Sequence, residues 1–280
     1  MAVNVIRRKE LYEIMPEGLV TTHKWLMGNN LTRHAIDNLV KSNQLESINK
    51  GVYVRNVSKI TWQSVVFSLQ SILKLDLVVG GLTALEMQGL SHYLSLSENK
   101  IVHLFGNDLL PEWVTNLDLN IKFVRHTTNS LFVENKENKQ LPPFTSERDW
   151  DNDNRKLILS TPERAYLEVL LDVPQKTTFE HADQLMQGLT TLSPRNLQKV
   201  LECCQNIKVK RLFFWFADRQ NYVWLGKINR ESITLGSGNR MLIKGGKLDT
   251  KYKDLSSQFS KNNSTLFWSI FSAPHRTFAP

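Results

Sequence analysis

Apolar and polar residues recur at helical spacing over three short blocks at the start of the chain. Residues 5–15 mix apolar and charged positions in the pattern of one amphipathic helix, which Pro16-Glu17-Gly18 would end. A second short helix is predicted through residues 25–27, and Thr21 or Thr22 is placed to cap it. Two short helices this close together are typical of a helix-turn-helix.

The third helix is predicted from Leu31 to about Ser42, after a Gly28-Asn29-Asn30 turn that tolerates left-handed backbone. Its apolar residues share one face. At 100° per residue the polar side chains fall on the opposite face, which is the candidate DNA-reading surface. Its residues are Arg33, His34, Asp37 and Lys41.

Two short strands are predicted directly after the third helix. Residues 45–48 and 52–55 flank an Asn49-Lys50-Gly51 turn, and a hairpin in this position is the wing of a winged helix-turn-helix. Side chains suited to base edges and phosphates lie on the third helix and on or beside the wing, namely Arg33, His34, Asn38, Lys41, Lys50 and Arg55. Winged helices also dock proteins, so a protein-interaction module without specific DNA binding is the alternative. For Asp37 a solvated helix face is the preferred interpretation.

The charge distribution supports a nucleic-acid partner. Nine Lys and Arg against five Asp and Glu give residues 1–60 a net charge of +4, 13 against 17 give residues 61–199 −4, and 11 against 4 give residues 200–253 +7. Basic segments attract polyanions and release counterions on binding them. The charged start and the lack of a long apolar run predict a cytoplasmic protein without contact to a membrane. Cys203 and Cys204 are expected to be reduced thiols, at least one of them buried.

The rest of the chain predicts a mixed α/β fold of the α+β class, helix-rich in its second half. A helix over residues 61–75 precedes a buried strand at 77–79 and a helix at 82–89. Gly80-Gly81 between them resembles a phosphate loop only superficially, because the glycine spacing and the Lys-Ser/Thr of such loops are missing. Tight packing of helix on strand is the preferred reason for these glycines.

Further strands, a loop and four helices follow. Strands are predicted at residues 100–105 and 119–125, and a polar loop at 134–153. The helices are predicted at residues 162–171, 179–189, 194–205 and about 208–219.

Two basic segments near the C-terminus allow a functional and a structural interpretation each. Lys208 to Arg211 precede the aromatic residues 212–216, which could stack on single-stranded nucleic acid; a buried helix with Lys210 and Arg211 reaching solvent is preferred. Residues 236–240, near Lys244 and Lys247, could bind phosphate or form a plain β-turn.

No spacing of residues indicates a catalytic or metal site. The seven histidines show no ligand pattern, so no metal and no cofactor are expected. Asp149, Asp151 and Asp153 lack the flanks of a calcium loop and are expected to be solvated. The set Glu112, Asp118 and Lys122 matches a nuclease poorly. We therefore expect that the protein is not an enzyme.

Several stretches resemble AbiEi antitoxins, which belong to abortive-infection, type IV toxin–antitoxin pairs. The N-terminal pieces are Val40-Lys41-Ser42, Leu45-Glu46-Ser47-Ile48 and Lys50-Gly51-Val52-Tyr53. The others are residues 78–85 running into 89–94, and Leu235 to Arg240 after Lys210 to Phe213. The resemblance covers about residues 5–253. It departs at Ser42-Asn43-Gln44, where a glycine and an aromatic residue are expected, and at residues 254–280.

The resemblance implies a winged helix-turn-helix at residues 1–58, an antitoxin domain at 61–253 and a tail of uncertain structure at 254–280. It implies an autorepressor that binds inverted repeats in its own promoter and counteracts a nucleotidyltransferase-like toxin without a stable complex between the two. Carried over by position, Thr32 joins Arg33, His34 and Lys41 as DNA contacts, with Lys50 and Arg55 at the wing. It also implies a basic C-terminal surface of Lys208, Lys210, Arg211, Arg240 and Lys244 that adds DNA affinity or antitoxicity.

Overall fold

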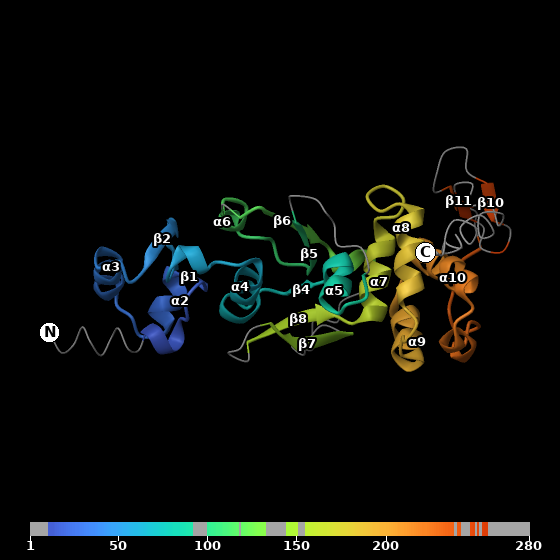
Figure 1. Ribbon diagram of the computed structural model, residues 1–280, viewed down its shortest axis with the longest axis horizontal. Coiled ribbons are helices and arrows are strands. Elements are labelled where there is room, and N and C mark those ends of the chain that lie inside the picture. The colour runs from blue at the N-terminus through green and yellow to red at the C-terminus, as the bar shows by residue number, and fades with distance from the viewer. Residues whose placement is uncertain are drawn as a thin grey trace, which may run out of the picture.

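The winged helix, a central sheet and a set of helices follow one another along the length of the molecule (Figure 1). The computed structural model describes residues 11–91, 100–117, 119–132, 144–150, 155–237, 240–241, 247–249, 251 and 254–256. Helices and strands are both present, which confirms the α+β class.

The N-terminal elements form the predicted winged helix. Residues 11–14 are helical, and the predicted start of that helix at residues 5–10 lies outside the described residues. The elements that follow are β1 (Val20–Thr22), α2 (His23–Gly28), α3 (Arg33–Lys41), β2 (Glu46–Asn49) and β3 (Val52–Val54). The sequence did not predict β1, which is three residues long and pairs antiparallel with β3 in the order β1-β3-β2.

A five-stranded mixed sheet occupies the middle of the molecule, in the order β6-β5-β4-β8-β7. Its strands are β4 (Leu77–Val79), β5 (Lys100–Gly106), β6 (Ile121–His126), β7 (Thr145–Asp149) and β8 (Lys156–Ser160). The short helices around it are α4 (Trp62–Phe67), continued by a π-helical turn at Ser68–Ile72, α5 (Gly81–Met87) and α6 (Glu112–Thr115); 3-10 turns lie at Val57–Lys59 and Thr128–Ser130.

A polar loop was predicted over residues 134–153, and this is wrong at residues 145–149, which form strand β7. Thr145–Asp149 pair antiparallel with β8. The strand lies at the edge of the sheet, four of its five residues are exposed, and it therefore lacks the apolar alternation that indicates a strand. Asp149 is exposed, as predicted, whereas Asp151 and Asp153 lie outside the described residues.

The second half is rich in helices, as predicted. They are α7 (Pro162–Leu171), α8 (Phe179–Gly188), α9 (Pro194–Cys203) and α10 (Ile207–Gln220), followed by a 3-10 turn at Val223–Lys227. A small sheet joins β9 (Arg240–Met241), β10 (Lys247–Asp249) and β11 (Asp254–Ser256). Both cysteines are free thiols and Cys204 is buried, which confirms that prediction.

Two apolar cores lie in the described parts of the chain. The smaller one holds the helices of the winged helix together. The larger one runs from the winged helix through the central sheet to Ile233, because Val20 and Val54 pack in the same cluster as Trp62 and Leu69. The predicted domain boundary between residues 58 and 61 thus lies between segments that share apolar contacts, and it stays a prediction.

None of the helices among the described residues is long and apolar enough to cross a membrane. The predicted tail lies outside the described residues from position 257 onward.

Candidate DNA-binding surface

The apolar face of α3 packs into the core of the winged helix. Ile36 and Leu39 pack in the smaller core with Leu26 of α2 and Leu45 after α3. At its start the Thr32 hydroxyl accepts a hydrogen bond from the Ala35 amide at 3.3 Å, which satisfies one of the free N–H groups of a helix N-terminus. The cap and the core together fix which side chains point outward.

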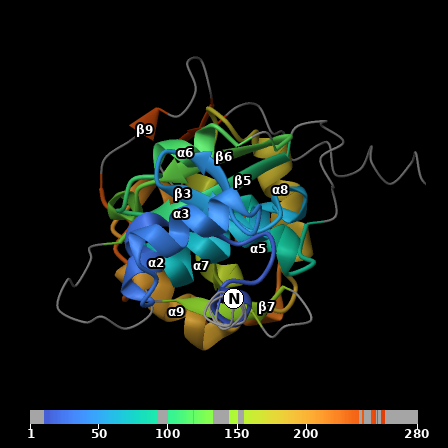
Figure 2. The same cartoon turned by 90° about the vertical axis from the view of Figure 1, so that its left-hand side faces the viewer.

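The predicted polar face of α3 is largely open to solvent. Arg33, His34 and Lys41 are exposed, whereas Asn38 is half-buried and its amide donates to His34 Nε2 at 3.1 Å. Arg33 and Lys41 are eight residues apart, about 12 Å along a helix axis, which is close to the width of a major groove, also about 12 Å. Figure 2 looks onto this end of the molecule, with α2 and α3 at the front.

The wing presents Lys50 at its tip. Gly51 takes the left-handed conformation that the tight turn requires, with φ +71°. The Lys50 backbone amide donates to Asn49 Oδ1 at 2.6 Å, so the turn is held while the Lys50 side chain stays exposed. The exposure of Lys50 is what its predicted role requires.

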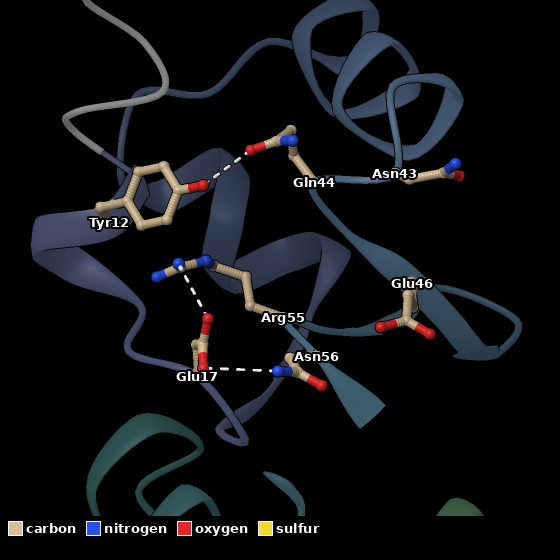
Figure 3. Close-up of a pocket in the computed structure, with 7 residues that line it drawn as sticks. All are labelled: Tyr12, Glu17, Asn43, Gln44, Glu46, Arg55 and Asn56. Atoms are coloured by element: carbon tan, nitrogen blue, oxygen red, sulfur yellow. Dashed lines mark hydrogen bonds and ion pairs between the residues drawn. The ribbon is translucent and has the colours of Figure 1, made fainter. Parts of the chain in front are cut away.

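Arg55 is placed differently from the exposed cations of α3 and the wing, and its role as a DNA contact stays a prediction. It is 7% exposed and lies in a polar depression of about 210 Å³ whose lining includes the carboxylates of Glu17 and Glu46 (Figure 3). Its guanidinium donates to the Met15 carbonyl at 2.7 Å, lies 4.0 Å from Glu17 and packs 3.7 Å from the centre of the Tyr12 ring. Arg55 therefore ties β3 to the end of the first helix.

Lys24 and Lys59 also belong to this region, although neither was predicted as a DNA contact. Lys24 is exposed on α2, the helix that precedes the reading helix, and Lys59 is exposed after the wing. In a helix-turn-helix the earlier helix crosses the phosphate backbone, so the position of Lys24 in α2 was the available signal.

Burial contradicts the predicted basic C-terminal surface at two of its residues. Lys210 is 4% exposed and Arg211 2% exposed. The Lys208 ammonium donates to the carbonyls of Leu171 and Val173, each at 2.7 Å. Arg211 Nε donates to the Leu235 carbonyl at 2.7 Å. These cations join α10 to the end of α7 and to the segment after α10. The side chain of Arg240 and the whole of Lys244 lie outside the described residues.

The aromatic residues 212–216 were predicted to form a buried helix from which Lys210 and Arg211 reach solvent, and this prediction is confirmed in part. Phe213, Phe214 and Phe216 are fully buried in α10, so they form core and no stacking platform. The expectation that Lys210 and Arg211 reach solvent is wrong, because α10 is covered around most of its circumference.

Gly80-Gly81 serve tight packing, as predicted, and the adjoining helix start already holds an anion. A Cβ at Gly80 would come within 2.4 Å of both Glu168 Oε2 and Phe105. The Gly81 amide donates to Glu168 Oε2 at 2.8 Å, while Ser160 and Arg164 donate to Glu168 Oε1. A carboxylate of the protein itself therefore occupies the place that a phosphate would take in a phosphate loop.

Side chains far apart in the sequence meet at one place that the sequence spacing did not reveal. His103, His126 and Asp172 offer ligand atoms that all lie within 4.8 Å of one another. Three residues had been compared with a nuclease site. Glu112 lies on α6 and Lys122 on β6, whereas Asp118 lies outside the described residues.

Two family models together match most of the chain. Residues 5–96 match the family model of the N-terminal domain of the AbiEi antitoxin, a transcriptional regulator. Residues 99–255 match the family model described as transcriptional regulator, AbiEi antitoxin, type IV toxin–antitoxin system. No curated protein matches the chain. Among solved structures, the crystal structure of the RV2827C protein from Mycobacterium tuberculosis is similar at 14% identity and a TM-score of 0.47, over 84% of this chain and 85% of that one.

Proposed function

Since the chain belongs to the AbiEi family of antitoxins and transcriptional regulators of type IV toxin–antitoxin systems, we propose that it represses its own operon by setting α3 into the major groove of inverted repeats in its promoter. The observation that supports this most is the exposed pair Arg33 and Lys41 on a helix whose opposite face is fixed in a core. It acts by binding and not by catalysis.

The proposed contacts divide by chemistry. Arg33 reads base edges near the start of α3, where residues of a recognition helix reach the groove floor. Lys41, Lys50 and Lys24 contact phosphates, since each ends in an exposed point charge. Thr32, His34 and Asn38 complete the surface. Thr32 also caps the helix, and the hydrogen bond between His34 and Asn38 holds both side chains in place.

A gel shift on the upstream DNA of the operon tests the proposal. The purified chain is compared with a variant carrying Arg33→Ala and Lys41→Ala, with competitor DNA, at two salt concentrations. The matched control carries Arg195→Ala and Lys199→Ala, because these residues are also an exposed arginine and lysine on one helix, α9, and their loss changes the net charge equally.

Specific binding that is lost in the α3 variant and kept in the α9 variant supports the autorepressor. Binding of the wild type should weaken as salt rises, because each neutralised phosphate releases counterions. The absence of binding at either salt concentration would contradict the proposal and favour a winged helix that docks a protein.

The antitoxin activity is proposed to reside outside the DNA-reading surface, and to counteract a nucleotidyltransferase-like toxin without a stable complex. The support is that the family model for the type IV antitoxin matches residues 99–255, beyond the winged helix. The full chain with Arg33→Ala and Lys41→Ala should then still restore growth to cells that produce the cognate toxin from another promoter. Failure of rescue at normal protein level would argue that DNA binding is required for antitoxicity.

A further inference from the structure

His103, His126 and Asp172 are brought together by three separate elements of the central fold. His103 lies within β5, His126 ends β6, and Asp172 directly follows α7. β5 and β6 are parallel neighbours, with Phe105 opposite His126, so His103 and His126 are on the same face of the sheet. The end of α7 reaches that face.

The distances between these groups suit shared coordination of one ion. His103 Nδ1 and His126 Nε2 are 3.0 Å apart, and one ligand atom from each of the three residues lies within 4.8 Å of the other two. A tetrahedral zinc ion with bonds of about 2.0–2.1 Å separates its ligand atoms by roughly 3.3–3.4 Å. Small movements of the side chains would bring one ligand atom of each residue to that spacing.

Packing holds both imidazoles in place. The His126 ring stacks on Phe105 at 4.6 Å with an interplanar angle of 10°. The backbone of His103 is fixed on both sides, since its amide donates to the Thr83 hydroxyl oxygen at 3.0 Å and its carbonyl accepts a hydrogen bond from the Gly80 amide at 3.0 Å. Rings held in this way lose little further freedom on binding an ion.

The charge state of the cluster is favourable for a metal ion. Burial lowers the pKa of His103 to about 4 and also lowers the pKa of His126, which favours the neutral imidazoles that metal ions bind. The Asp172 carboxylate is 19% exposed and lies 3.5 Å from the ammonium of Lys176, which is 64% exposed. Lys176 can swing into solvent when an ion takes its place beside Asp172.

We propose that His103, His126 and Asp172 form a binding site for one divalent transition-metal ion, with Zn²⁺ as the best fit to two imidazoles and one carboxylate. The bound ion joins the end of α7 to strands β5 and β6. Three protein ligands leave a further position for water or a partner group. The site is independent of the DNA-reading surface on α3.

Titration calorimetry of the full, tag-free chain with Zn²⁺ tests the site, and Co²⁺ absorption identifies nitrogen and oxygen ligands by its d–d bands. We expect saturation at one ion per chain. Saturating Zn²⁺ should also raise the Tm, by roughly 5 °C when the free ion is at about a hundred times Kd.

Two variants and a control decide the outcome. Asp172→Asn keeps the shape of the side chain and removes its charge, and His103→Ala removes a ligand; each should weaken Zn²⁺ binding at least about tenfold, because even partners outside the ligand set are worth roughly 10–100-fold. His181→Ala is the matched control, since His181 is another half-buried histidine whose pKa is lowered by burial, and it lies on α8. It should bind Zn²⁺ as the wild type does.

The proposal is overturned if the wild type binds neither ion below about 1 mM. It is also overturned if Asp172→Asn binds as tightly as the control, a result that would leave the cluster as a hydrogen-bonded His–His–Asp chain without an ion. Should His103→Ala fail to fold, the near-isosteric Asp172→Asn still decides between these outcomes.

Discussion

The two basic regions of this chain look alike in sequence and differ completely in structure. Around α3 and the wing, Arg33, Lys41 and Lys50 are exposed. On α10, Lys210 and Arg211 are buried and Lys208 donates to backbone carbonyls at and just beyond the end of α7. The cations of the first region are open to a polyanion, whereas in the second Lys208 and Arg211 donate to backbone carbonyls of the protein and Lys210 is buried.

The difference follows from what surrounds each helix. α3 packs along one side only, so its polar face remains in water. α10 contacts α7 and α8 within the larger core, and its long cationic side chains must find partners there. Net charge therefore predicts a binding surface only after burial is known.

The largest expected effect tests whether burial is what distinguishes charged residues inside the protein from charged residues on its surface. Glu168→Gln should lower the free energy of unfolding by about 3–5 kcal/mol, because it removes the charge of the buried carboxylate that pairs with Arg164, which is 1% exposed. Urea denaturation measures it. Glu147→Gln is the control; its ion pair with Lys156 is half-exposed, so the change should stay within about 1 kcal/mol. Equal effects of the two substitutions would break the comparison.

Arg211→Met examines α10 directly. We expect a loss of about 2 kcal/mol of stability, since the Leu235 carbonyl loses its charged donor in a buried place. Affinity for the operator should not change at temperatures where the variant is folded. Arg195→Met, on the exposed face of α9, serves as the control in both assays. A selective loss of DNA affinity in Arg211→Met would show that this residue contributes to DNA binding.

Arg55→Met sharpens the comparison within the winged helix itself. Arg55 lies in the DNA-binding region by sequence, yet its contacts resemble those of α10. Removing its hydrogen bond to the Met15 carbonyl should cost about 1–2 kcal/mol of stability. The slope of log K against log salt should stay as in the wild type, as measured by fluorescence anisotropy on operator DNA; a reduced slope would show that Arg55 neutralises a phosphate after all.

The smallest expected effect is that of Lys50→Ala at the tip of the wing. The salt slope should fall by about 0.9, the contribution of one phosphate contact, while stability changes by less than about 0.5 kcal/mol. The same anisotropy titrations measure the slope. An unchanged slope would place the wing tip away from DNA and leave binding to α3 and α2.

Local patterns in the sequence predicted the winged helix and the helices of the second half well. α7 has its proline at the start and an acidic first turn, and α3 has a clear apolar face. β1 and β7 were missed because short or exposed strands are defined by their neighbours and not by alternation.

The candidate site could be predicted only as far as local sequence determines exposure. Arg33 and Lys41 were found because helical spacing places them opposite the apolar face. The partners of Arg211 and Lys208 lie 24 to 37 residues away, and Arg55 meets a carbonyl 40 residues away. The cluster of His103, His126 and Asp172 forms only when β5, β6 and α7 are packed together. No local spacing carries such information.

The larger core that takes in Val20 and Val54 of the wing sheet sets the angle of α3 relative to the central sheet. Two copies on an inverted repeat would then carry their bulky ends in directions dictated by the DNA helix. Inserting about five base pairs between the half-sites would turn one copy to the far side of the duplex, whereas inserting about ten would restore the original arrangement. Repression that depends on the helical phase of the two half-sites in this way would show that the winged helix is held rigidly on the central fold.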